Sequence, residues 1–154
     1  MLKKIIVPIL LLFLSSCGYE AIYSKKNRID YDFSVSELTF TGDRDVNNKI
    51  KQRINNYTLD RKNKNFTLKI SSDAEKVILV KDAAGNSTSF KSTLTVKIEI
   101  MMNNKFKNNL QIVESFNYDN NANKSDLKKY EKEIISNLAE IVAEKLLYNL
   151  SNTQ

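Results

Sequence analysis

Histidine and tryptophan are absent from this 154-residue chain, which holds only one cysteine, one proline and three glycines. Without histidine and without a second cysteine, it lacks the commonest general base, Cys–His nucleophiles and Cys/His metal sites. The glycines, Gly18, Gly42 and Gly85, are too widely spaced to form a loop that cradles phosphate. We therefore expect a protein that is not an enzyme and that uses no metal and no cofactor.

The N-terminus has the three parts of a secretory signal. Lys3 and Lys4 supply positive charge, residues 5–14 carry no charge and are mostly apolar, and two serines follow as the small residues that processing peptidases require. An apolar run this short does not span a bilayer as a helix. We predict that residues 1–16 are a signal peptide that is removed on export.

Cys17 is the only cysteine, and it directly follows the predicted signal. A single cysteine in an exported protein has no partner for an intramolecular disulfide. The order Leu-Ser-Ser-Cys that ends at Cys17 resembles the lipobox of bacterial lipoproteins. That resemblance implies a covalent lipid on Cys17 and a lipidated tether over residues 17–32, and Gly18 in place of aspartate favours the outer membrane. The alternative is an ordinary signal peptide with a cysteine nearby by chance.

The formal net charge is +6, and it falls to about +4 when the two lysines of the predicted signal are removed. A basic excess favours acidic partners such as phosphorylated lipids or nucleic acid. Export makes nucleic acid an unsuitable partner. The richness in Lys, Asn and Ile is also what the coding bias of an AT-rich genome would produce, so charge alone identifies no ligand.

Alternating apolar residues, the pattern typical of strands, occur over residues 33–40, 66–80, 88–102 and 110–118. The first of these strands has a change of phase near Glu37. The second is either one long strand with a bulge or two short strands. The last three are predicted to form an antiparallel meander, with turns near Gly85 and over residues 103–108.

Two helices are predicted from apolar residues at a helical period, over residues 44–59 and 125–150. The candidate N-caps are Asp43 or Asp45 for the first helix and Ser125 or Asp126 for the second. The second helix has a broad apolar stripe that includes Tyr130 and Ile141. A stripe of this kind is buried against another layer of structure.

The order of these elements predicts an α+β fold, β-α-β-β-β-α. The simplest arrangement is a two-layer sandwich, with a four-stranded, mostly antiparallel sheet and two helices on one face. Residues 33–150 are expected to form a single domain, and residues 151–154 a tail.

The strand over residues 88–102 has the clearest alternation. One face carries Phe90, Leu94, Val96, Ile98, Ile100 and Met102, and the other carries Ser89, Lys91, Thr93, Thr95, Lys97 and Glu99. The apolar face is expected to be core. Because both helices are predicted on that side, the polar face is expected to meet water or another protein.

Three segments resemble the LPS-assembly lipoprotein family (LptE). They are Cys17-Gly18-Tyr19 with Ile22-Tyr23 after it, the hairpin over residues 80–90, and the Ala-containing helix over residues 138–146. The resemblance covers most of the mature chain. It implies a lipoprotein at the periplasmic face of the outer membrane that plugs a large β-barrel, the LPS-assembly protein D. It also implies that the protein helps this barrel to assemble and binds lipopolysaccharide during transport.

A lipopolysaccharide site would be ionic, because the phosphates and carboxylates of this ligand attract ammonium groups. The candidates are Lys81 and Lys91, which flank the predicted hairpin turn, and Lys124, in the loop before the last helix. The alternative for each of them is an ordinary solvated lysine.

Two other functions are compatible with parts of the sequence. An auxiliary lipoprotein of a phospholipid-transport system would share the anchor and a small α+β domain, but it would need an apolar groove for acyl chains. A periplasmic hydrolase that uses serine and carboxylates would need a convergent acid–base pair, and no spacing in the sequence indicates one.

Overall fold

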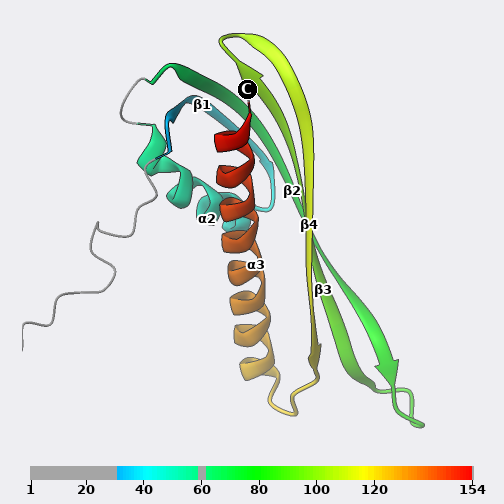
Figure 1. Ribbon diagram of the computed structural model, residues 1–154. Helices are drawn as coiled ribbons and strands as arrows, with labels where there is room; N and C mark the ends of the chain where they lie inside the picture. The colour runs from blue at the N-terminus through cyan, green and yellow to red at the C-terminus, as the bar shows by residue number, and fades with distance from the viewer. Residues whose placement is uncertain (1–30, 59–61, 154) are drawn as a thin grey trace, which may run out of the picture. The chain divides into compact units, whose positions relative to one another are not determined.

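The computed structural model describes residues 31–58 and 62–153, and Figure 1 shows their arrangement. The elements are β1 (Phe33–Gly42), α2 (Arg44–Ile54), the short 3-10 helix η2 (Asn55–Tyr57), β2 (Lys64–Lys81), β3 (Ser87–Met102), β4 (Lys105–Asp119) and α3 (Lys124–Asn152). The strands lie in the order β1-β2-β3-β4, with β1 parallel to β2 and the other pairs antiparallel. The predicted fold class is confirmed. Cys17 lies outside the described residues, whereas Tyr31, at the end of the predicted tether, stacks on Phe33 with ring centroids 5.6 Å apart.

A tight junction joins β1 to α2. The pairing of β1 with β2 shifts between Val35 and Glu37, where the sequence predicts a change of phase. Gly42 ends β1 with a φ of 91°, a left-handed conformation that glycine adopts without steric cost. Asp43 is the N-cap of α2, because its side chain accepts hydrogen bonds of 2.9 and 3.0 Å from two backbone N–H groups of the first turn.

The antiparallel meander of β2, β3 and β4 is confirmed. β2 is a single strand whose register is irregular near Val80, so the alternative of two short strands is wrong. The predicted turn over residues 103–108 is too long. Only Asn103 and Asn104, with φ of 51° and 63°, connect β3 to β4. Asparagine tolerates the left-handed conformation, so two of them close a tight hairpin and leave residues 105–108 for β4.

Both helices lie on the same face of the sheet (Figure 1) and run parallel to each other. The core between the layers is apolar, and its fully buried members include Ile50, Phe66, Leu68, Leu94 and Leu146. The predicted burial of Tyr130 and Ile141 is wrong, since both are exposed. α3 packs beside α2 and over β3 and β4, and its residues Ile141 and Tyr148 remain exposed. Within the described residues, no helix is long and apolar enough to cross a membrane.

The predicted N-caps of the last helix are also wrong. The N-cap of α3 is Asn123, whose side-chain oxygen accepts hydrogen bonds from the backbone N–H groups of Ser125 and Asp126, at 3.0 and 3.4 Å. A cap reaches the N–H groups two and three residues along the chain, so the two predicted caps are the residues that Asn123 caps. α3 continues to Asn152, two residues past the predicted end.

Candidate functional site

The face of the sheet opposite the helices is polar, and none of the described elements covers it. A hollow of about 630 Å³ lies on this face. The polar residues that line it, here called the open face, are Thr39 and Thr41 of β1, Lys69 and Ser71 of β2, Lys97 and Glu99 of β3, and Asn109 and Gln111 of β4. They alternate along the strands with buried residues such as Ile70 and Ile98. The predicted polar face is therefore present and spans all four strands.

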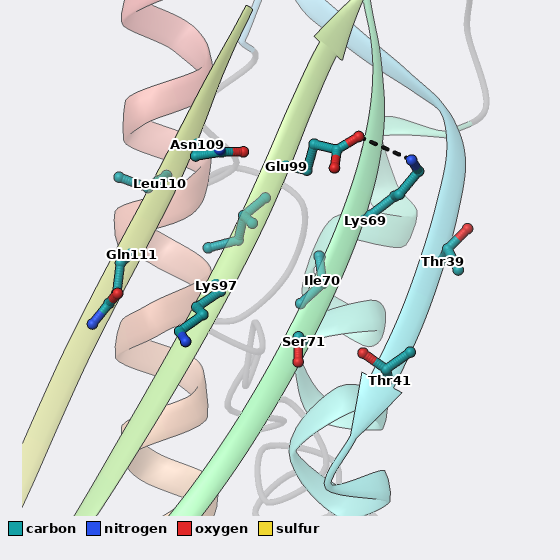
Figure 2. A pocket seen from close by; sticks show the side chains of 11 residues that line it. Thr39, Thr41, Lys69, Ile70, Ser71, Lys97, Glu99, Asn109, Leu110 and Gln111 are labelled. Atoms are coloured by element: carbon teal, nitrogen blue, oxygen red, sulfur yellow. Dashed lines mark hydrogen bonds and ion pairs between the residues drawn. The ribbon is translucent and has the colours of Figure 1, made fainter. Parts of the chain in front are cut away.

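Two of the three charged side chains on the open face form an ion pair, and the third does not (Figure 2). Lys69 Nζ lies 2.9 Å from Glu99 Oε1, so these two charges are paired. Lys97 projects between Gln111 and Ser71 and has no carboxylate partner among the described residues. An ammonium beside amide and hydroxyl groups can bind an anionic or hydroxyl-rich surface. The described residues include no group of carboxylates placed to hold a metal ion. The groups on the open face that can bind a partner are its ammonium, hydroxyl and amide groups.

The three lysines predicted to bind ligand all lie at one end of the sheet, here called the distal end. Lys81 is the last residue of β2 and pairs with Ser87 of β3, and Lys91 lies four residues further along β3. Lys124 begins α3, and its Nζ lies 3.4 Å from Asn120 Oδ1. Asn120 Nδ2 in turn donates to the Ser87 carbonyl at 2.7 Å. The fold therefore brings residues from three elements to the same end.

Four consecutive apolar residues are exposed at the distal end. This distal apolar strip consists of Val77, Ile78, Leu79 and Val80, with exposed fractions between 42 and 53%. β1 ends opposite Ser72, so β2 has no neighbour on that side over the strip. The turn that follows is held by Asp82, which accepts hydrogen bonds from the side chain and backbone of Asn86 and from the backbone of Ala84. The Asn86 side chain is the main cause that holds the pKa of the Asp82 carboxyl below its ordinary value.

A polar network attaches α3 to the distal half of the sheet. The hydroxyl of Tyr118 donates to Glu131 Oε1 at 3.0 Å and lies 3.4 Å from Ser92 Oγ. Lys76 Nζ donates to the same Glu131 oxygen at 2.5 Å and lies 3.9 Å from the centre of the Phe90 ring. Burial is the main cause that raises the pKa of the Tyr118 hydroxyl. The network replaces apolar packing in this part of the layer interface.

Replacing Tyr118 with phenylalanine is expected to lower the free energy of unfolding by about 1–2 kcal/mol near neutral pH, because Glu131 and Ser92 lose a partner. The pKa of Tyr118 is higher in the folded state. Its stabilising contribution is therefore fully present below the unfolded-state pKa of about 10 and is lost as the pH rises through the folded-state pKa. Urea unfolding at about pH 8 and about pH 11 should show the difference between wild type and variant shrinking. A difference that does not change with pH would contradict this assignment.

Sequence reasoning identified the open face but none of its residues as binding groups. It placed Lys97 and Glu99 on the polar side of their strand, and Lys69 is not among its candidates. The sequence pattern could have placed Lys69 on the polar side of β2, because Lys69 lies between Leu68 and Ile70, which are both buried. What the sequence does not contain is the alignment of four strands that brings these residues to one hollow.

Comparison with known proteins identifies the fold. The sequence matches no protein-family model and no curated protein. The structure is similar to that of rare lipoprotein B from Shewanella oneidensis, with a TM-score of 0.60, 15% identity, and coverage of 76% of this chain and 95% of that one. A minor lipoprotein from Acinetobacter baumannii gives a TM-score of 0.58 and 13% identity over 77% of this chain and 92% of that one. A lipoprotein from Caulobacter crescentus gives 0.54 and 12% over 76% and 87%. At these identities the likeness concerns the fold alone, and the chain has the fold of these bacterial lipoproteins.

Proposed function

We propose that this protein is an outer-membrane lipoprotein of the LPS-assembly family. It plugs the β-barrel LPS-assembly protein D, helps the barrel to assemble, and binds lipopolysaccharide on its way to the cell surface. It is anchored at the periplasmic face by the lipid on Cys17, it is not an enzyme, and it binds no nucleic acid. The resemblance of its sequence to this family and its lipoprotein fold both support the proposal.

The open face is the observation that carries the proposal. A domain that fills a barrel must present polar groups, because the lumen of such a barrel is polar and contains water. The hydroxyl, ammonium and amide groups of Thr39, Lys97 and Gln111 line the hollow of the sheet and can pair with a surface of that kind. A carrier of phospholipid would need an apolar hollow for acyl chains. The polar side chains that alternate along β3, among them Thr95, Lys97 and Glu99, favour the plug over the phospholipid-transport alternative.

The residues at the distal end support the proposal that the protein binds lipopolysaccharide. Lipopolysaccharide carries phosphate and carboxylate groups next to acyl chains. The distal apolar strip adjoins Lys81 in β2, and Lys91 pairs with Val77 across the hairpin. This end of the sheet thus presents cations beside exposed apolar surface, as an amphiphilic anion requires.

An affinity capture from gently solubilised outer membranes tests the barrel partner. The full-length chain with a C-terminal tag is expected to recover one large β-barrel in near-equal amounts, identified by mass spectrometry. A Cys17→Ser variant exported through an ordinary signal peptide is the control, and it should recover the same barrel. Recovery of inner-membrane transport components, or of phospholipid without a barrel, would contradict the proposal and favour the phospholipid-transport function.

Removing the three distal lysines tests the ligand. The combined change Lys81→Ala, Lys91→Ala and Lys124→Ala is expected to weaken lipopolysaccharide binding at least about tenfold, because charged hydrogen bonds to the ligand are lost. Binding is measured with purified lipopolysaccharide and the full-length protein in detergent. The matched control removes Lys51, Lys105 and Lys107, which lie away from the distal end, and it should bind as the wild type does. Equal losses in both triple variants would show that net charge alone is responsible.

A further inference from the structure

The end of the sheet opposite the distal end, here called the proximal end, carries an exposed apolar side chain beside the tight turn from β3 to β4 (Figure 1). Phe106 is 62% exposed, and no other phenylalanine of the described residues is exposed as much. It pairs with Met101 across the hairpin, and Met101 pairs with Thr67 of β2. A single exposed apolar side chain is common on protein surfaces, so the surroundings of Phe106 decide whether it has a partner.

The described domain begins at this same end. Tyr31 stacks on Phe33, which is the first residue of β1. Phe33 pairs with the first residue of β2. The carbonyl oxygen of the next residue of β2, Asn65, accepts a hydrogen bond of 3.1 Å from the backbone N–H of Asn103 in the β3–β4 turn. The chain that leads from Cys17 therefore joins the domain beside this turn.

The length of the chain between Cys17 and the domain limits which end can meet a membrane. Residues 18–30 separate Cys17 from Tyr31, so these two residues are at most about 50 Å apart. The distal apolar strip lies about 43–53 Å along β2 from the first residue of that strand. A bilayer that holds the proposed lipid on Cys17 is therefore within easy reach of the proximal end. The distal end would reach the same bilayer only with a fully extended connection.

Basic residues outnumber acidic ones around Phe106, which lies between Lys105 and Lys107 in β4. Ammonium groups are attracted to the phosphates of anionic lipids, and an aromatic ring beside them can lie at the level of the headgroups. The charged residues of β1, β2 and β4 and of their flanking segments at the proximal end are Lys62, Lys64, Lys105 and Lys107, against Asp32 and Glu37.

We propose that the proximal end contacts the phospholipid surface in which the lipid of Cys17 is anchored. Phe106 enters the headgroup region, and the lysines on either side of it meet lipid phosphates. The occupant is a phospholipid surface because the chain from Cys17 joins the domain at this end, and because the charge of this end complements anionic headgroups. The inference rests on the proposed lipid anchor, and it involves neither the barrel nor lipopolysaccharide.

Tryptophan fluorescence tests the contact, because the chain has no tryptophan of its own. The full-length lipoprotein with Phe106→Trp is placed in vesicles of phosphatidylethanolamine and phosphatidylglycerol whose acyl chains carry bromine, a quencher of nearby tryptophan. Its emission is expected to be at least about twofold lower than in vesicles without bromine. The matched control is Phe116→Trp, at an exposed phenylalanine further along β4, and its emission should be the same in both kinds of vesicle.

Flotation of the vesicles separates the anchor from the contact. Both variants should float with the vesicles if Cys17 carries the lipid. Variants that float but show equal emission changes at positions 106 and 116 would overturn the contact and leave the anchor in place. Variants that do not float would overturn the anchor and, with it, this inference.

A charge reversal tests the part of the lysines. Lys105→Glu, added to the Phe106→Trp variant, is expected to reduce the quenching by brominated lipid at least about twofold, because the new carboxylate repels the phosphates. The matched control adds Lys129→Glu, at an exposed lysine of α3, to the same variant, and it should leave the quenching unchanged. Equal quenching after the two changes would overturn the contact between the lysines and the phosphates.

Discussion

Replacing Gly42 with alanine is expected to lower the free energy of unfolding by more than about 3 kcal/mol. Gly42 has a φ of 91°, and a Cβ atom at this position would lie 1.8 Å from the backbone oxygen of Ser72. That oxygen also accepts the backbone hydrogen bond from Asp43. The strand β2 would have to move away from the junction between β1 and α2, so the parallel pairing that closes this side of the sheet would be lost with it.

Urea unfolding measured by circular dichroism gives this change in free energy. Gly85→Ala is the matched control, since its φ of 85° is similar but no atom lies within 4 Å of an added Cβ. Only the conformational cost remains there, about 1 kcal/mol. If the two alanine variants lost the same stability, the close approach of Gly42 to β2 would not be the cause.

In cells without the barrel partner, a Cys17→Ser variant exported through an ordinary signal peptide is expected to move from the membrane fraction to the soluble fraction. The proposed lipid contributes about 0.8 kcal/mol of membrane affinity for each buried methylene group, and the serine variant lacks this contribution. Fractionation with mass analysis of the N-terminus measures both the location and the modification.

Gly18→Asp is the companion variant, because it should keep the lipid while favouring retention at the inner membrane. A Cys17→Ser protein that stays in the outer membrane of cells without the barrel would contradict lipid anchoring. A Cys17→Ser protein that becomes soluble but still captures the barrel would show that anchoring and plugging are separate properties, as the proposed function requires.

The sequence by itself determined the features that depend on neighbouring residues. The order of strands and helices, the change of phase near Glu37 and the polar face that includes Lys97 all follow from local periodicity. The structure confirms them because a strand of period two and a helix of period 3.6 each turn one side toward the core. The lipobox that ends at Cys17 is equally local, and its modification stays a prediction.

Only the tertiary structure decided what lies at the ends and edges of these elements. Val77 and Ile141 are large apolar residues of the kind that usually form a core, yet both are exposed. β1 ends opposite Ser72, and α3 packs toward α2, so no further element covers either residue. The gathering of Lys81, Lys91 and Lys124 at one end likewise depends on pairings between segments far apart in the chain. Burial and proximity are set by where a distant element stops, and a local pattern contains no information about that point.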